Sequence, residues 1–139
     1  MLEKLNDFLE EFKSIDDRDT RFDYLIEVAD RFKEVPTDVA TRPFSKDNLV
    51  PACESEAYVF LEKNNNKCNF YFAVENPQGI SAKAMAVILS ESLNGLTPDE
   101  ISTIKEDIVL DIFGGAISMG KGQGLMSMVQ LVKFFANKN

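Results

Sequence analysis

Histidine and tryptophan are absent from this chain of 139 residues, and cysteine occurs only twice, as Cys53 and Cys68. Without histidine the chain has no Ser-His or Cys-His nucleophile pair and no imidazole ligand for zinc. Two cysteines cannot form the set of disulfides that stabilises small secreted domains. We therefore expect both thiols to be free, and any catalysis to proceed without an imidazole.

Positive charge and long apolar runs are also scarce. Fifteen Lys and Arg residues against 23 Asp and Glu residues give a formal net charge of -8. Nucleic acid and anionic membranes repel a chain of this charge, so we expect neither as a partner. No apolar run approaches the roughly 20 residues that span a bilayer. The start of the sequence lacks the basic and apolar sections of a secretory signal, and the expected location is the cytoplasm.

The composition, with 45% hydrophobic and 27% charged residues, is typical of a globular protein, and we expect a single domain over residues 1–139. Apolar residues at helical spacing predict one helix near residues 2–12 and another that begins at Asp16 or Asp17, includes Phe22 and Phe32 in its buried face, and stops before Pro36. Later helices are predicted over residues 81–93 with Ser81 as the cap, from Thr97 onward, and from Leu125 to the C-terminus after the glycine-rich residues 120–124.

Alternating apolar residues predict two strands. Residues 55–62 and 68–74 flank a polar turn at residues 63–67, which favours an antiparallel hairpin. Ala57 and Val59 fall on one face, and Tyr58 and Phe60 fall on the other, so both faces should be partly covered. Residues 108–110 also have the composition of a strand. Helices around a small antiparallel sheet define an α+β fold.

Cys53 is the candidate functional residue. It stands in Val50-Pro51-Ala52-Cys53-Glu54-Ser55, between the irregular residues 37–51 and the first strand, where proline and small residues leave a thiol accessible. A single cysteine can equally be a small buried hydrophobe, so this local context leaves both interpretations open. Cys68 alternates with Phe70 and Phe72 along the second strand, which predicts a core position. A redox disulfide between the two cysteines is a further alternative.

Residues 115–122 come within one position of a phosphate-binding P-loop. Gly122 stands where the Ser or Thr that holds magnesium would be, which argues against nucleotide binding. The same glycines would allow a turn into the last helix, with Lys121 exposed beside its start. An iron–sulfur scaffold would usually need four thiolates, which two cysteines cannot supply.

Several motifs together resemble the SufE family of sulfur-acceptor proteins, over about residues 18–135. Residues 21–27 resemble the family's early helix, and residues 50–55 resemble its Val-x-Gly-Cys-Gln-Ser loop. Residues 82–101, with their Thr-Pro-Asp-Glu-Ile segment, are similar to its central helix and the helix start that follows. Gly122-Gln123-Gly124-Leu125 resembles the entry to its last helix. The chain departs from the family at three positions. Ala52 stands where the family usually has Gly, Glu54 stands where it usually has Gln, and Lys121 lies near a position where Arg is common.

The resemblance implies a SufE/IscU-like fold and a catalytic role for Cys53. This thiol would take persulfide sulfur from a SufS-like, pyridoxal-phosphate-dependent cysteine desulfurase, stimulate that enzyme, and deliver the sulfur to an iron–sulfur scaffold complex. The chain itself would hold no cofactor and no metal, and it would act as a co-substrate and activator. The alternative is an interaction module that regulates a desulfurase, or another partner, without thiol chemistry.

The sequence also predicts a sheltered loop. A persulfide must be protected from stray thiols and still reach into a partner's site. We expect Cys53 to be substantially buried in the free protein, with Tyr58 and Phe60 as an apolar shelter. The resemblance further implies that Lys121 and residues 120–124 lie near this loop, which would swing outward when the desulfurase binds.

Overall fold

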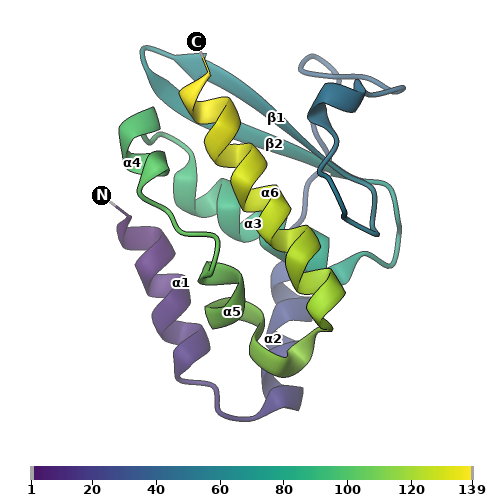
Figure 1. Cartoon of the computed structure of the whole chain (residues 1–139), viewed down its shortest axis with the longest axis vertical. Coiled ribbons are helices and arrows are strands. Elements are labelled where there is room, and N and C mark those ends of the chain that lie inside the picture. The colour runs from purple at the N-terminus through teal and green to yellow at the C-terminus, as the bar shows by residue number, and fades with distance from the viewer. Residues whose placement is uncertain (1, 139) are drawn as a thin grey trace.

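Six α-helices and one β-hairpin lie within residues 2–138, the part of the chain that this computed structural model describes. In chain order the elements are α1 (Glu3–Lys13), α2 (Arg18–Ala29), the 3-10 turn η1 (Lys46–Asn48), β1 (Ala57–Asn64), β2 (Lys67–Val74), α3 (Ile80–Leu93), α4 (Pro98–Ser102), α5 (Ile108–Phe113), the 3-10 turn η2 (Gly114–Ala116) and α6 (Met119–Asn137). Figure 1 shows α6 lying along the hairpin, with α1, α2 and α5 gathered in the lower half of the view. The predicted α+β class is confirmed. None of these helices combines the length and the hydropathy that crossing a bilayer requires.

The hairpin has the predicted antiparallel register. Ala57 lies opposite Val74 at one end, and Asn64 lies opposite Lys67 at the other. The two turn residues between the strands, Asn65 and Asn66, have φ values of 52° and 65°. Such a turn matches the twist of the strands, and asparagine tolerates the left-handed conformation it requires.

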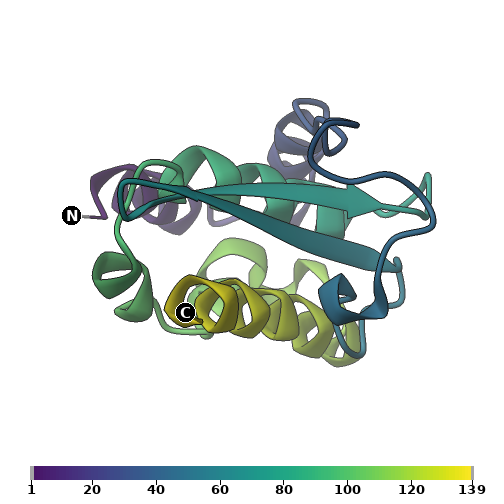
Figure 2. The same cartoon turned by 90° about the horizontal axis from the view of Figure 1, so that it is seen from above.

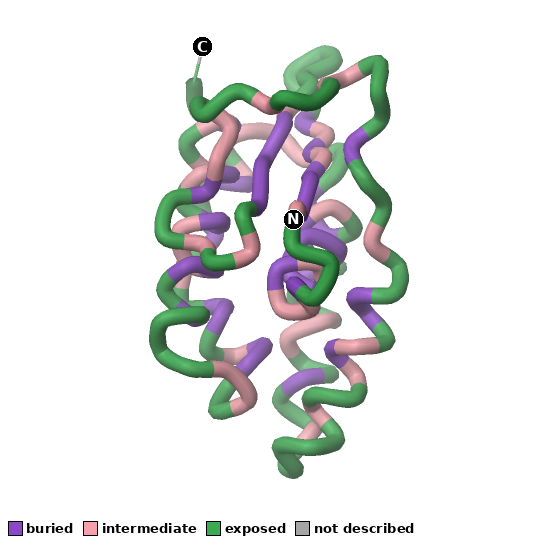
Figure 3. Tube along the Cα trace, turned by 90° about the vertical axis from the view of Figure 1, so that its right-hand side faces the viewer, coloured by how far each residue is buried: buried purple, intermediate pink, exposed green. Residues whose placement is uncertain are grey.

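The main core lies between one face of the hairpin and the helices (Figure 3). The hairpin contributes Ala57, Val59, Phe72 and Val74 to this core. The middle of α3 is buried on all sides, so its residues 84–89 are apolar without a polar face. The largest side chains that are fully buried include Phe12, Phe70, Phe113, Met85 and Leu89.

The outer face of the hairpin is covered by irregular chain instead of helices. Tyr58 and Phe60 form a second apolar cluster there with Val35 and Ala73, against which Phe44 packs. The ring centroid of Phe44 lies 5.1 Å from that of Tyr58 and 5.2 Å from that of Phe60. Figure 2 shows the segment before β1 at the end of the hairpin away from its turn. Both faces are therefore covered, as predicted, but by different kinds of structure.

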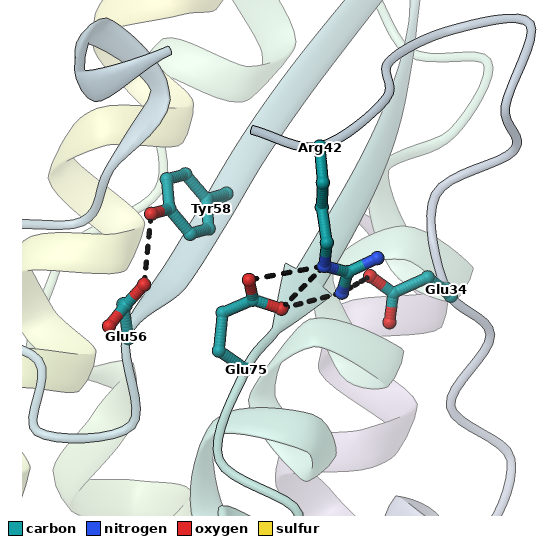
Figure 4. Close-up of polar contacts among 5 residues, drawn as sticks. All are labelled: Glu34, Arg42, Glu56, Tyr58 and Glu75. Atoms are coloured by element: carbon teal, nitrogen blue, oxygen red, sulfur yellow. Dashed lines mark hydrogen bonds and ion pairs between the residues drawn. The ribbon is translucent and has the colours of Figure 1, made fainter. Parts of the chain in front are cut away.

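Ionic contacts fasten this covering segment to the hairpin (Figure 4). The guanidinium of Arg42 donates hydrogen bonds to the carboxylates of Glu75 and Glu34. These hydrogen bonds raise the pKa of Arg42, which also lies over the ring of Phe44 at 4.8 Å from its centroid. Nearby, the Tyr58 hydroxyl donates to the carboxylate of Glu56. The contacts of Arg42 are exposed, so they orient the segment more than they stabilise the fold.

Two helix ends differ from the prediction. The second helix ends at Ala29, so Phe32 lies beyond it, and the chain then extends until the Val35 N–H donates to the Phe72 carbonyl at 2.9 Å. The spacing of apolar residues predicted a longer helix, but residues 30–35 extend toward β2 and make this hydrogen bond instead. The cap of α3 is Gly79, with no side-chain hydrogen bond, and Ser81 falls inside the first turn. Asp17 does cap α2, because its carboxylate accepts from the Thr20 N–H at 2.9 Å.

The strand predicted at residues 108–110 is wrong, because these residues begin α5. Ile108, Val109, Ile112 and Phe113 are buried while Leu110 is 58% exposed, and this is a helical pattern that the short apolar run concealed. The prediction that residues 120–124 form a turn is also wrong. Ser118 caps α6, and these residues lie within its first turns. The strand, loop and helix order of a P-loop is therefore absent here.

Candidate functional site

Cys53 lies on a cavity of about 180 Å³ between the beginnings of two helices. Cys53 is half-buried and packs against the main core. The cavity is also lined by the first turn of α3, by residues of α6 and by Phe22 of α2, and the residues concerned are Phe22, Cys53, Glu54, Ser55, Asn76, Gln78, Gly79, Ile80, Ser81, Ala82, Lys121, Gly124 and Leu125. As predicted, Cys53 stands at a junction between irregular chain and the first strand.

Backbone hydrogen bonds hold the Cys53 loop at both ends. On the first side the Val50 N–H donates to the Ala57 carbonyl at 2.8 Å. On the second side the Asn76 N–H donates to the Ser55 carbonyl at 3.2 Å. Within the loop the Glu56 N–H donates to the Cys53 carbonyl, also at 3.2 Å. Residues 51–54 form a short tip between these anchors.

Two residues of the loop adopt the left-handed conformation. Ala52 has φ of 60° and Glu56 has φ of 52°. Residues with a Cβ atom are strained there by roughly 1 kcal/mol or more, whereas glycine is not. The left-handed conformation of Ala52 turns the chain just before Cys53, which lines the cavity between α3 and α6.

Groups of both charge signs line the cavity of Cys53. The first N–H groups of a helix have no partner within the helix and carry partial positive charge. The start of α3 has no side-chain cap, and its residues Ser81 and Ala82 line the cavity. The exposed side chains of Lys121, on α6, and of Glu54 line the same cavity with opposite formal charges.

Cys68 is fully buried, as predicted. It faces the main core from β2, and its N–H donates to the Leu96 carbonyl at 2.8 Å. Burial raises the pKa of its thiol, so it stays protonated and unreactive at neutral pH. Cys68 pairs with Lys63 near the hairpin turn, whereas Cys53 precedes the opposite end of β1. Six residues of strand separate those ends by about 20 Å, far beyond the reach of a disulfide.

The predicted shelter for Cys53 is wrong. Tyr58 and Phe60 point to the outer face of the hairpin, because alternate residues of a strand point to opposite sides. Phe22, Ala82 and Leu125 line the cavity of Cys53 instead. The prediction of a buried Phe22 also fails in part, since this ring is 38% exposed beside the cavity. Cys53 itself is only half-buried.

Arg21 has a structural role that the sequence pattern did not show. Its guanidinium donates to four backbone carbonyls at 2.7 to 2.9 Å. They belong to Phe12 in the last turn of α1, to Ile15 just after that helix, and to Asp111 and Ile112 in α5. Carbonyls at helix ends lack partners within the helix, so one side chain satisfies two ends together. Arg21 thereby fixes α2, which carries Phe22 to the cavity.

Within residues 2–138 no three or more His, Cys, Asp or Glu side chains gather as ligands for a metal ion.

Comparisons with known proteins identify the family. A family model described as SufE, Fe-S metabolism associated domain, matches residues 6–136. No curated protein sequence matches the chain. Seven chains of solved structures match it, among them the solution structure of a hypothetical protein from Thermus thermophilus. That structure has a TM-score of 0.70 and 23% sequence identity, and the match covers 94% of this chain and 91% of that one.

The fold and the half-buried cysteine on its loop define an α+β protein with one accessible thiol. The chain belongs to the SufE family, and it is associated with Fe-S metabolism. The likeness to the Thermus thermophilus structure shows the fold alone. In the SufE-family loop that residues 50–55 resemble, glycine usually stands at the position of Ala52. A preference for glycine agrees with the positive φ that Ala52 has in this structure.

Proposed function

We propose that Cys53 accepts sulfur from the persulfide of a cysteine desulfurase and passes it toward iron–sulfur cluster assembly. The observation that carries this proposal is the contrast between the two thiols in a SufE-family chain. Cys53 lines an open cavity, whereas Cys68 is sealed in the core. Only Cys53 meets the requirement of accessibility for thiol exchange.

The chemistry is a thiol exchange that needs no oxidant or reductant. The thiolate of Cys53 attacks the outer sulfur of the partner's persulfide, and a new S–S bond forms. The bond between that outer sulfur and the partner's cysteine breaks, and the partner's sulfur leaves as a thiolate. Cys53 then carries an –S–SH group. The pyridoxal phosphate that releases sulfur from free cysteine belongs to the desulfurase.

The cavity favours this exchange at two points. Lys121 and the uncapped start of α3 line the cavity, and in this proposal they offset the negative charge that passes between the two sulfurs during transfer, against the opposing charge of Glu54. The apolar side chains of Phe22 and Leu125 exclude stray thiols from one side of the sulfur. The recipient that follows is an iron–sulfur scaffold complex, and the proposed location of the exchange is the cytoplasm.

Desulfurase turnover distinguishes an acceptor from a regulator without thiol chemistry. A SufS-like desulfurase is assayed for alanine formation from cysteine, alone, with this protein, and with its Cys53→Ser and Cys68→Ala variants. We expect stimulation by the wild-type and Cys68→Ala proteins and none by Cys53→Ser, which should remain folded because residue 53 lies on a loop. Full stimulation by Cys53→Ser would support the alternative, a regulator that acts by contact alone.

A further inference from the structure

Gly124 lies where the Cys53 loop meets α6. A Cβ atom added to Gly124 would stand 2.8 Å from the backbone oxygen of Ala52 and 3.1 Å from the Cα of Cys53. Both are backbone atoms, so neither can move away by a side-chain rotation. Only a residue without Cβ lets the loop rest on the helix in this position.

The other glycines in the first turns of α6 have no such neighbours. Nothing lies within 4 Å of a Cβ built on Gly120, and a Cβ on Gly122 would contact only the Ile117 side chain at 3.9 Å. Glycine weakens a helix interior relative to alanine. The close approach of the loop therefore gives a physical reason for glycine at 124 that does not apply at 120 or 122.

We propose that Gly124 is a positioning residue for Cys53, and that its bare backbone is the support that holds the thiol against the cavity. The tip at residues 51–54 is anchored at Val50 and Ser55, and between those anchors it rests on α6 at Gly124. A methyl group at position 124 pushes Ala52 and Cys53 away from the helix. The anchors stay in place, so the displacement is taken up by the tip and exposes the sulfur.

For the proposed sulfur transfer, this support regulates the lifetime of a persulfide on Cys53. A persulfide held in the cavity is protected from free thiols, and one on a displaced tip is not. This consequence rests on the proposed function. The contact between Gly124 and the loop does not, so the two can fail separately.

Alkylation of the cysteines tests the support directly in the whole chain. Wild-type protein and the variants Gly124→Ala, Gly120→Ala and Gly122→Ala are treated with iodoacetamide, and labelling of each cysteine peptide is followed by mass spectrometry. We expect Cys53 to react at least about fivefold faster in Gly124→Ala and at the wild-type rate in the two matched controls. Cys68 reports unfolding, and it should stay unlabelled in all four proteins.

Several outcomes would overturn the proposal. One is labelling of Cys53 in Gly124→Ala at the wild-type rate, and another is equal acceleration in all three variants. If Gly124→Ala also exposes Cys68, the comparison is repeated in a stabilising osmolyte that restores protection of Cys68, with the same fivefold criterion. In the wild-type protein, Cys53 should react at least about tenfold more slowly than in urea, and equal rates would contradict a supported thiol.

Persulfide lifetime provides a second measurement that a merely structural role would not change. Wild-type and Gly124→Ala proteins loaded by a desulfurase are exposed to dithiothreitol, and loss of the added sulfur is timed. We expect loss at least about fivefold faster from Gly124→Ala, and equal lifetimes would contradict the regulatory consequence. If no persulfide forms on either protein while alkylation still differs, the proposed function fails and the positioning role stands.

Discussion

Ala52 holds a backbone conformation that suits glycine, with φ of 60°. We expect Ala52→Gly to raise the free energy of unfolding by up to about 1 kcal/mol, because relief of the strain exceeds the extra entropy of the unfolded chain. Urea denaturation measures this difference. The control is Ala116→Gly, where φ is not positive, and it should lower stability. A loss of stability in Ala52→Gly would show that the loop is not strained.

Arg21 holds two helix ends through four carbonyl hydrogen bonds. We expect Arg21→Ala to lower the free energy of unfolding by about 2–4 kcal/mol, since part-buried carbonyls lose a charged donor. Lysine has no planar fork, so Arg21→Lys should recover only part of this loss. Thermal or urea denaturation gives the values, with Arg18→Ala as the exposed control that changes little. Full recovery of stability in Arg21→Lys would show that the planar guanidinium is not required.

The sequence allowed the two thiols to be assigned to different environments, but it did not show what surrounds Cys53. Alternation with Phe70 and Phe72 placed Cys68 in the core, because strand periodicity is a local property. The neighbours Phe22 and Gly124 come from distant parts of the chain, and no local pattern relates them to residue 53. Their assembly depends on tertiary packing.

At the scale of elements, strong periodicity predicted the hairpin and most helices correctly. The wrong predictions concern segments whose residue types suggest one structure, while the surrounding fold gives them another. Residues 120–124 look like a turn because of their glycines, yet Ser118 caps a helix that includes them. Residues 108–110 look like a strand because they are apolar and two of them, Ile108 and Val109, are β-branched. A run of three residues is too short to distinguish the periodicity of a strand from that of a helix.

The hydrogen-bond anchors of the Cys53 loop limit which residues can move. We expect binding of a cysteine desulfurase to change hydrogen exchange at residues 51–54 and to leave residues 45–50 unchanged. The side-chain amide of Asn48 donates to the Val59 carbonyl, and the backbone N–H of Val50 donates to the Ala57 carbonyl, at 2.8 Å each. The tip lacks comparable anchors. Exchange measured with and without the desulfurase gives the comparison. Equal change across residues 45–54 would contradict a moving tip.

At the scale of the whole molecule, the two faces of the hairpin are covered by different structures, and one of the two thiols stays accessible. Helices bury the inner face of the hairpin together with Cys68, and the segment before β1 covers the outer face. Cys53 lies beyond the end of the hairpin, where the starts of α3 and α6 meet it. The proposed exchange therefore uses a site at one end of the molecule, while the second thiol takes no part.

Site-resolved mass spectrometry after incubation with a cysteine desulfurase and cysteine tests the proposed transfer most directly. We expect the Cys53 peptide to gain about 32 Da, the mass of one sulfur, and the Cys68 peptide to remain unmodified. The gain should disappear in Cys53→Ser and persist in Cys68→Ala, which we expect to lose only about 1 kcal/mol of stability. Sulfur found on Cys68, or no sulfur on Cys53 beside an active desulfurase, would contradict Cys53 as the acceptor.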